Sequence, residues 1–261
     1  MYSKNLKDEL VKLANAPAFK VKHKTFPAGQ EPRSAVIFNT VDDNFHPKSI
    51  KQAKEKADWR KRLEKKHTHF KDNGVKEMQS SNSSDALAMN IFCHPDLPGW
   101  KGVAQLFNVD SITNIDFGYN PKLLKNGINE PTPTEVDLYL NQTFICEAKL
   151  TESDFTEKAK TSVELYDDFS TVFEVSALKQ TETSYHNYQL IRNILAAYSE
   201  QKQFYLLCDA RRPDLARSFF ETVRCIKDVN LRLRCNILYW QDIAAACGQD
   251  LRDFLAEKYG I

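Results

Sequence analysis

The clearest pattern of apolar and polar positions lies in two short segments, VDLYL (136–140) and TFICEAKL (143–150). Each segment alternates apolar with polar residues, and this period of two predicts a β-strand. The Asn141-Gln142 pair between them is typical of a tight turn, so the two strands are expected to form a hairpin. Both strands also carry charged residues where a sheet core is usually apolar.

The other elements are predicted from helical spacing and from apolar runs. Helices are expected at residues 6–13, at 84–92 after an N-cap at Ser83 or Ser84, at 161–169, within 184–201, and from Pro213 to about 226. Strands are expected at residues 34–38, 171–178, 203–209 and 235–240, and two short helices end the chain. Residues 103–119 fit either strands or irregular chain. The resulting order predicts an α/β fold with a mixed central β-sheet flanked by helices.

The chain is expected to divide into an N-terminal extension, residues 1–77, and a compact domain, residues 78–261. Residues 71–85 are rich in Gly, Asn and Ser, which is typical of a link. The preceding segment 51–66, KQAKEKADWRKRLEKK, holds eight Lys or Arg against three acids and predicts a basic helix. Such a helix can be solvated or can contact phosphates, and we favour the solvated form.

Composition limits the function classes. The chain has 261 residues, is 42% hydrophobic and carries a net charge of +1, so any nucleic-acid interaction must come from a local site. Six cysteines without metal-ligand spacing predict reduced core thiols, and we assign no metal to His67, His69 or His94. No glycine-rich phosphate loop supports ATP or dinucleotide use. The charged start lacks a long apolar segment, so we expect neither a signal peptide nor a membrane anchor, and a cytoplasmic location.

The charged residues of the hairpin are the leading candidates for chemistry. Strand periodicity places Glu147 and Lys149 on one face, and Asp137 lies on the neighbouring strand. A two-residue turn would pair Leu140 with Thr143 and would turn Asp137 to the other face, unless a bulge, a strong twist or splayed strand ends correct this. If the residues converge, the two carboxylates and the backbone carbonyl of Ala148 can hold Mg²⁺ or Mn²⁺.

A metal in this position would serve phosphodiester hydrolysis, with Lys149 balancing phosphate charge, orienting water or, with a lowered pKa, assisting proton transfer. The alternative is a structural ion pair on the exposed face of an antiparallel sheet. Glu-x-Lys also occurs at Glu64/Lys66 and Glu200/Lys202, but only the hairpin copy lies in a strand pattern with an acid ten residues before it.

Asp137, the ten-residue gap and Glu147-Ala148-Lys149 resemble the core motif of the PD-(D/E)XK nuclease superfamily. The segments EAKLTESDF and YHNYQLIRN resemble a restriction-endonuclease-like group within it. The resemblance covers about residues 80–210 and implies an αβββαβ core, with Asp137 and Glu147 as metal ligands and Lys149 as the catalytic lysine. Val136 stands where the superfamily usually has a proline.

Accessory residues are predicted around this motif. Alternation makes Glu135 an auxiliary ligand candidate. The resemblance also implies a polar or acidic residue on the first core helix, for which Asp85 is the candidate. For Asp85 we favour the alternative of a first-turn acid that complements the helix dipole. Gln189 is expected to support Lys149 or to bind a phosphate, and Arg192 to bind a phosphate; the alternative is a helix edge that faces solvent or Glu152.

Arg211 and Arg212 are candidate contacts to the DNA backbone, or else they pair with Asp209 and Asp214. These inferences predict a divalent-metal-dependent endonuclease acting on DNA, restriction-like or repair-like. The alternative is a catalytically inactive nucleic-acid-binding or interaction module on the same fold. Cleavage of both strands of a duplex would favour a homodimer.

Overall fold

A five-stranded mixed sheet forms the centre of the protein in the computed structural model, which describes residues 1–16, 23–26, 32, 34–68, 70, 74–129 and 135–261. Its strand order is β1-β4-β5-β8-β9, with β1 antiparallel to β4, β4 antiparallel to β5, and β5, β8 and β9 parallel. The bounds are β1 Ile115–Tyr119, β4 Val136–Leu140, β5 Phe144–Ala148, β8 Gln203–Cys208 and β9 Cys235–Tyr239.

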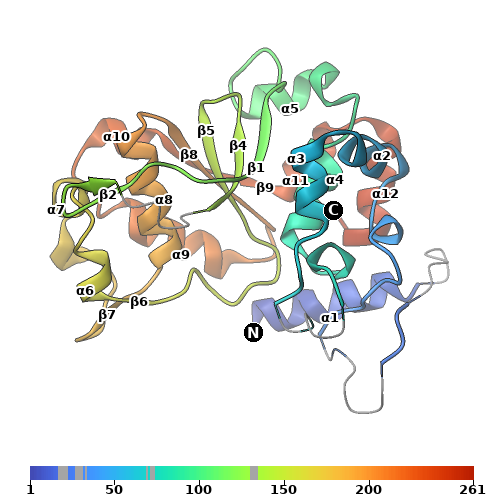
Figure 1. Cartoon of the computed structure of the whole chain (residues 1–261), viewed down its shortest axis with the longest axis horizontal. Helices are drawn as coiled ribbons and strands as arrows, with labels where there is room; N and C mark the ends of the chain where they lie inside the picture. The colour runs from blue at the N-terminus through green and yellow to red at the C-terminus, as the bar shows by residue number, and fades with distance from the viewer. Residues whose placement is uncertain (17–22, 27–31, 33, 69, 71–73, 130–134) are drawn as a thin grey trace.

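Helices cover both faces of the sheet (Figure 1). Leu138 and Leu140 point into a core shared with α1 Tyr2–Ala14, α2 Pro47–Glu55, α3 Ala57–Leu63, α4 Ser84–Phe92, α5 Lys101–Leu106, α11 Trp240–Ala246 and α12 Gln249–Tyr259. The alternate residues Tyr139 and Ile145 point into a second core with α6 Lys160–Val163, α7 Phe169–Val172, α8 Tyr188–Ser199, α9 Pro213–Val223 and α10 Val229–Leu233. This arrangement confirms the predicted fold class, because helices pack on both faces of the mixed sheet and bury both faces of its central strands β4, β5 and β8.

Smaller elements lie around this core. Two-stranded ladders pair β2 Leu124–Lys125 with β3 Ile128–Asn129, and β6 Lys158–Ala159 with β7 Ser184–Tyr185. Short 3₁₀ turns span Asp42–Asn44, Glu77–Gln79, Leu97–Gly99 and Val175–Ala177. Within this framework the order α4, β1, β4, β5, α8, β8 matches the expected αβββαβ core.

Several predicted elements need correction. Residues 171–178 are not a strand: α7 ends at Val172 and a 3₁₀ turn follows, because the apolar residues Phe169, Val172 and Phe173 meet the core at helical spacing. Residues 34–38 are not a strand: they form only isolated bridges, at Ile37 and Phe38. Short apolar runs leave helix, strand and bridge difficult to separate by pattern alone.

The N-terminal residues pack against the central domain. Leu6 and Leu10 of α1, Ile50 of α2, and Trp59 and Leu63 of α3 lie in the same apolar core as α4 and the sheet. The predicted single basic helix is two helices, because Lys56 between them is extended (φ −90°, ψ 122°). After this break α3 turns toward the sheet, and the Trp59 indole donates a 3.0 Å hydrogen bond to the Ile115 carbonyl. A domain boundary at residue 77 stays a prediction.

The six cysteines are free and buried, which confirms their prediction as core thiols. Ser83 is the N-cap of α4, since its hydroxyl accepts a 3.1 Å hydrogen bond from the Ala86 amide. Among the helices of the described residues, none has the length and the apolar composition needed to cross a membrane.

Candidate active site

The turn between β4 and β5 decides whether the predicted acidic residues meet. Leu140 pairs with Phe144 and Leu138 with Cys146, so three residues rather than two separate the strands. Asn141 and Gln142 both take positive φ, 50° and 53°, and the Thr143 amide donates to the Leu140 carbonyl at 2.9 Å. The predicted two-residue register was therefore wrong, and the observed one, extended by one residue, places Asp137 opposite Glu147.

Asp137 lies where the two strands separate. Backbone pairing between β4 and β5 ends at Leu138. Beyond it the Asp137 carboxyl group, in place of a backbone carbonyl, accepts a 2.8 Å hydrogen bond from the Ala148 amide. Asp137 and Glu147 consequently face the same side of the sheet, on adjacent strands. The extra turn residue therefore brings the two acidic side chains together without a bulge.

Glu147 and Lys149 form a buried pair that α8 holds in place. Glu147 is 2% and Lys149 5% exposed, which is not the exposure of a solvated sheet face. One Glu147 oxygen lies 2.8 Å from Lys149 Nζ, and the other accepts a 2.6 Å hydrogen bond from Asn193 Nδ2. Lys149 Nζ also donates to Gln189 Oε1 at 3.1 Å, so the predicted contact between these two residues is confirmed.

Asn193 was missed by sequence reasoning. It lies four residues after Gln189, and residues at this spacing share a helix face, which is the signal that could have identified it. Asn193 is fully buried and bonded to Glu147, so α8 supplies two amide side chains that orient the pair from one side.

The charges in this cluster shift its protonation. Burial alone would lower the pKa of Lys149, but the carboxylates of Glu147, Glu152 and Asp137 outweigh burial and hold this pKa above its ordinary value. Desolvation and the neighbouring Glu147 raise the pKa of Asp137 to about 8. Lys149 is therefore a cation, and Asp137 is a carboxyl group whose ionised form the fold destabilises, so that it keeps its proton up to about pH 8.

The raised pKa of Asp137 predicts how stability depends on pH. Between about pH 4 and pH 8 the folded protein retains a proton on Asp137 that the unfolded chain releases, so in a chelating buffer this residue lowers stability as the pH rises. The Asp137→Asn variant lacks this contribution. Urea unfolding of both proteins should therefore show the variant gaining stability relative to the parent between about pH 5 and about pH 8. Parallel profiles would contradict the raised pKa.

The basic helix α3 reaches this cluster with Arg62, which is 8% exposed. Arg62 Nη2 lies 2.8 Å from Asp85 Oδ1 and 3.8 Å from Asp137 Oδ1, and Nη1 pairs with Glu135. Lys65 Nζ adds a 2.7 Å contact to the other oxygen of Asp85. The N-terminal segment thus supplies two cations to an acidic cluster that sequence reasoning had assigned to the later residues alone.

Asp85 and Glu135, which the sequence offered as possible metal ligands, both form ion pairs with Arg62. Burial alone would raise the pKa of Asp85, but Arg62 and Lys65 outweigh it and hold the pKa below its ordinary value. Glu135 is exposed just before β4, and its backbone carbonyl accepts a 2.9 Å hydrogen bond from Arg192 Nη2. Arg192 therefore lies beside Glu135 with its guanidinium bonded to protein, and its predicted contact with a phosphate stays a prediction.

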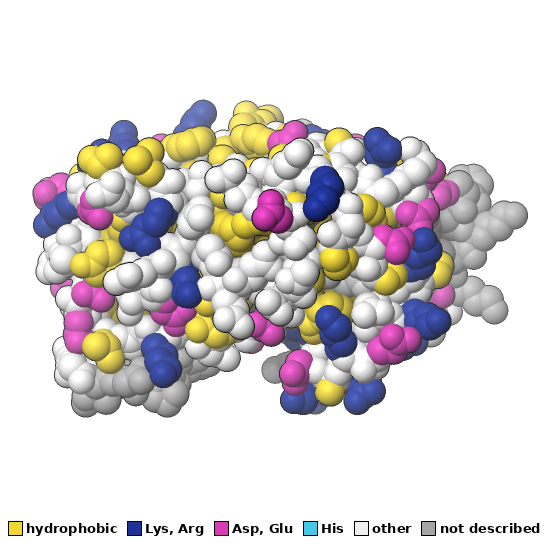
Figure 2. Space-filling model, turned by 90° about the horizontal axis from the view of Figure 1, so that it is seen from above, with side chains coloured by type: hydrophobic (Ala, Val, Ile, Leu, Met, Phe, Trp, Pro, Cys, Tyr) yellow, Lys and Arg dark blue, Asp and Glu magenta, His cyan; other side chains and the backbone are white. Residues whose placement is uncertain are grey.

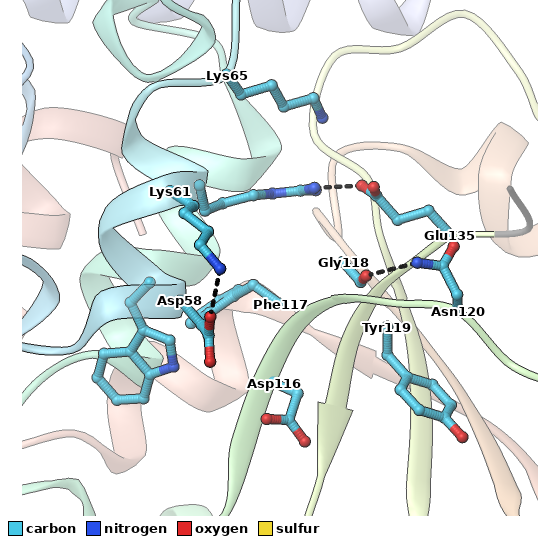
Figure 3. A pocket seen from close by; sticks show the side chains of 11 residues that line it. Asp58, Lys61, Lys65, Asp116, Phe117, Gly118, Tyr119, Asn120 and Glu135 are labelled. Carbon is cyan, nitrogen blue, oxygen red and sulfur yellow. Dashed lines mark hydrogen bonds and ion pairs between the residues drawn. The ribbon is translucent and has the colours of Figure 1, made fainter.

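An open pocket of about 500 Å³ adjoins the cluster, between α3 and β1 (Figure 3). Lys61 and Lys65 line its helix side, and Asp116 and Tyr119 line its strand side. Gly118 on β1 has φ +71°, and a Cβ there would lie 3.0 Å from Arg62 Nη1 and 3.2 Å from the Glu135 carboxyl carbon. The close approach of β1 to the Arg62–Glu135 pair therefore depends on glycine.

Gly118→Ala should destabilise the protein more than Gly127→Ala. Both glycines have positive φ, which costs an alanine about 1–2 kcal/mol, but a Cβ at Gly127 (φ +70°) meets nothing within 4 Å. Crowding of Arg62 should add roughly 1 kcal/mol or more at Gly118. Chemical denaturation measures the free energy of unfolding of both variants. Equal decreases in this free energy would show that Arg62 and Glu135 can move away from the new methyl group without loss of stability.

Arg211 and Arg212 are engaged elsewhere. Arg212 is fully buried, donating to the Leu150 carbonyl at 3.1 Å and to Asp214 at 2.8 Å. Arg211 pairs with Asp209 at 2.6 Å and with Glu9 at 2.7 Å. These contacts match the predicted alternative, in which the two arginines pair with Asp209 and Asp214. We therefore propose no contact between either arginine and DNA.

The donor set of the cluster fits a divalent cation that prefers oxygen. Asp137 and Glu147 bring two carboxylates together on one face, and their mutual repulsion is part of what raises the pKa of Asp137. A cation between them would relieve this repulsion, and the Ala148 carbonyl lies in the chain between Glu147 and Lys149. Asp85 and Glu135 are tied to Arg62 and are less available as ligands.

Comparison with models of known families found a match over most of the chain. A family model described as "Restriction Endonuclease associating with ARP" matches residues 12–260, nearly the whole chain. The protein therefore belongs to this family of restriction endonucleases, which is a class of nucleases. A search of curated proteins and a search of solved structures each found no match.

Proposed function

We propose that the protein is a divalent-metal-dependent endonuclease that hydrolyses phosphodiester bonds of DNA at a PD-(D/E)XK-type site. The observation that carries this proposal is the position of Asp137 opposite Glu147 on adjacent strands, with Lys149 paired to Glu147 at 2.8 Å. A structural ion pair alone would not need a second carboxylate whose charge the fold destabilises.

Asp137, Glu147 and the Ala148 carbonyl would hold Mg²⁺ or Mn²⁺, which supplies Lewis-acid polarisation of a phosphate oxygen and activation of water. Lys149, charged and fixed by Glu147 and Gln189, would balance charge that develops on the phosphate. Asn193 positions Glu147 by a hydrogen bond and need not touch the substrate.

The substrate backbone would approach through the pocket beside α3. Charges of both signs are interspersed over the face seen in Figure 2, in keeping with a net charge of +1, so attraction must be local. Lys61 and Lys65 line this pocket, and two cations at its edge suit phosphate oxygens. The basic helix therefore has a phosphate-contacting role in this proposal.

The proposal is tested by incubating plasmid and linear DNA with the full chain in Mg²⁺, in Mn²⁺ and in EDTA. We expect cleavage that needs a divalent ion and falls by at least about 100-fold in Asp137→Asn, which keeps the size and the Ala148 contact of the side chain. DNA binding that persists in EDTA and weakens with salt, without cleavage in either metal, would instead support the inactive binding module.

A further inference from the structure

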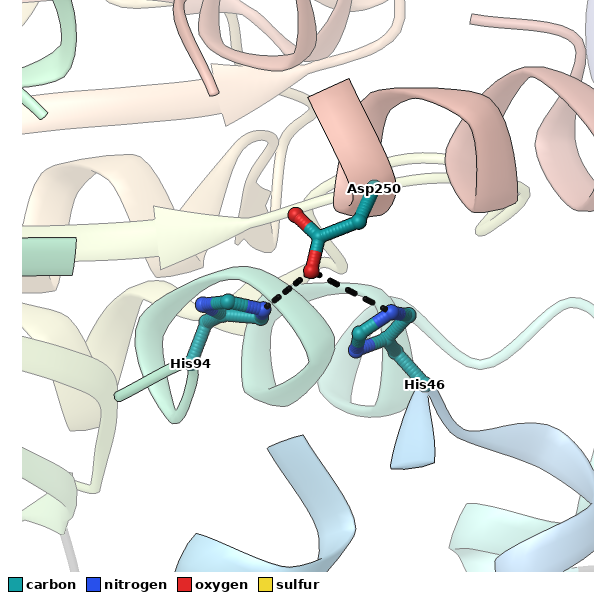
Figure 4. Close-up of side chains that lie close together, drawn as sticks. All are labelled: His46, His94 and Asp250. Carbon is teal, nitrogen blue, oxygen red and sulfur yellow. Dashed lines mark ion pairs between the residues drawn. The ribbon is translucent and has the colours of Figure 1, made fainter. Parts of the chain in front are cut away.

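Two histidines and an aspartate from distant parts of the chain meet at the ends of three helices (Figure 4). His46 is the residue before α2, His94 follows α4, and Asp250 lies in the first turn of α12. Both imidazoles point toward the Asp250 carboxylate. None of the three residues belongs to the Asp137 cluster, and sequence spacing assigned no metal to His94 because its partners lie far away along the chain.

The distances fit a group of ligands better than a set of hydrogen bonds. Asp250 Oδ2 lies 4.0 Å from His46 Nε2 and 3.7 Å from His94 Nε2, and one ligand atom from each residue lies within 4.8 Å of the others. Ligands about 2.0–2.1 Å from a tetrahedral zinc ion lie roughly 3.3 Å apart. The three side chains would close around an ion with movements on the order of 1 Å.

His94 supplies the second observation that points to a ligand. The residue is 2% exposed, and its Nε2 atom, which faces Asp250, has no hydrogen-bond partner. Buried polar atoms are normally satisfied, so an unpaired imidazole nitrogen directed at a carboxylate needs an explanation. A metal ion between them would provide the missing partner.

The other nitrogen of His94 must be consistent with this arrangement. His94 Nδ1 accepts a 3.2 Å hydrogen bond from the Asp96 amide, which leaves the proton of a neutral ring on Nε2. An ion at Nε2 would require the ring proton on Nδ1, which breaks the hydrogen bond from the Asp96 amide. The Asp96 carboxylate, 3.8 Å from Nδ1, can then accept a hydrogen bond from the Nδ1–H group after a small rotation. Metal-ligating histidines commonly donate their second N–H to a carboxylate in this way.

Lys48 currently balances the carboxylates. Its ammonium lies 2.7 Å from Asp250 Oδ2 and 3.2 Å from Asp96 Oδ2, and the side chain is about half exposed. We propose that His46, His94 and Asp250 form a zinc site, with Lys48 as a cation that leaves for solvent when the ion binds. Imidazole ligands favour zinc over magnesium, so this site is chemically distinct from the oxygen-rich Asp137 cluster.

Occupation of the site would join the beginning of α2, the end of α4 and the beginning of α12. Ligands from separate segments make ion binding a stabilising link, because the unfolded chain does not bring them together. We therefore expect zinc to raise the thermal unfolding midpoint of the protein whether or not the nuclease site is active.

The test is calorimetric titration of the metal-stripped full chain with ZnSO₄, together with thermal unfolding at each ratio. We expect one zinc ion per chain, an affinity at least about tenfold weaker in Asp250→Asn, and a tighter affinity in Lys48→Ala, where the competing cation is gone. Asp250 is 43% exposed in its side chain, so its variant should fold. His186→Ala is the matched control and should bind zinc like the parent, because its imidazole pairs with Glu157 at 2.6 Å outside both proposed sites.

The lysine variant makes the result decisive. A zinc affinity that rises in Lys48→Ala and falls in Asp250→Asn supports the site. Absence of binding in both the parent and Lys48→Ala would overturn it. Binding that is unchanged in Asp250→Asn but lost in Asp137→Asn would assign the ion to the acidic cluster and would also overturn it.

Discussion

Replacing Lys149 with alanine is expected to lower metal-dependent DNA cleavage by at least about 100-fold, the usual cost of losing one group that stabilises transition-state charge. Lys149 Nζ is fixed between Glu147 and Gln189, and the nearby carboxylates keep its pKa raised. The variant retains both proposed ligands, Asp137 and Glu147. Cleavage should therefore fall while Mn²⁺ binding, measured by calorimetry, persists.

The control for Lys149→Ala must separate chemistry from folding. Removing the lysine leaves Glu147 buried with Asn193 as its remaining partner, and breaking such a pair commonly costs about 3–5 kcal/mol. Assays should therefore run well below the unfolding midpoint of the variant. Lys202→Ala is the matched substitution, because Lys202 ends another Glu-x-Lys sequence outside the hairpin, and it should cut like the parent. A folded Lys149→Ala protein with parental cleavage would refute the assigned role.

The two strands of the hairpin could be predicted because alternation of apolar and polar residues is a property of neighbouring positions in the sequence. Residues 136–140 and 144–148 alternate in sequence and form β4 and β5, and Glu147 and Lys149 share a face as expected. The position of Asp137 could not be predicted equally well. It depends on one extra turn residue, and this in turn depends on positive φ at Asn141 and Gln142, which the sequence permits but does not require.

The contacts that Arg62 of α3 makes with the acidic cluster were harder to predict from the sequence. The charge excess of residues 51–66 fits a solvated helix equally well, and Lys61 is indeed exposed. Arg62 differs from Lys61 because the extended Lys56 and the buried Trp59 turn α3 against β1. Its partners, Asp85 and Glu135, lie in other elements, so their meeting is a property of tertiary packing rather than of local pattern.

Arg62→Ala is expected to lower the free energy of unfolding by about 3–5 kcal/mol, because Asp85 would stay buried with Lys65 as its remaining cation. Arg60→Ala is the matched control on the same helix. Arg60 is exposed and donates to the Lys54 carbonyl, so its loss should change stability by less than about 0.5 kcal/mol. Urea unfolding in EDTA measures both variants, and equal effects would contradict the importance of the Arg62 contacts.

A double-mutant cycle identifies which partner of Arg62 matters. If the buried charge of Asp85 is the cause, Asp85→Asn should recover much of the stability that Arg62→Ala loses. Mn²⁺ provides an independent measurement, since Arg62 Nη2 lies 3.8 Å from Asp137 Oδ1 and opposes a cation at the proposed site. Without the guanidinium, Mn²⁺ should bind more tightly and reduce the stability deficit of Arg62→Ala. This rescue should vanish when Asp137→Asn is added, because the ion would then lose the carboxylate that holds it.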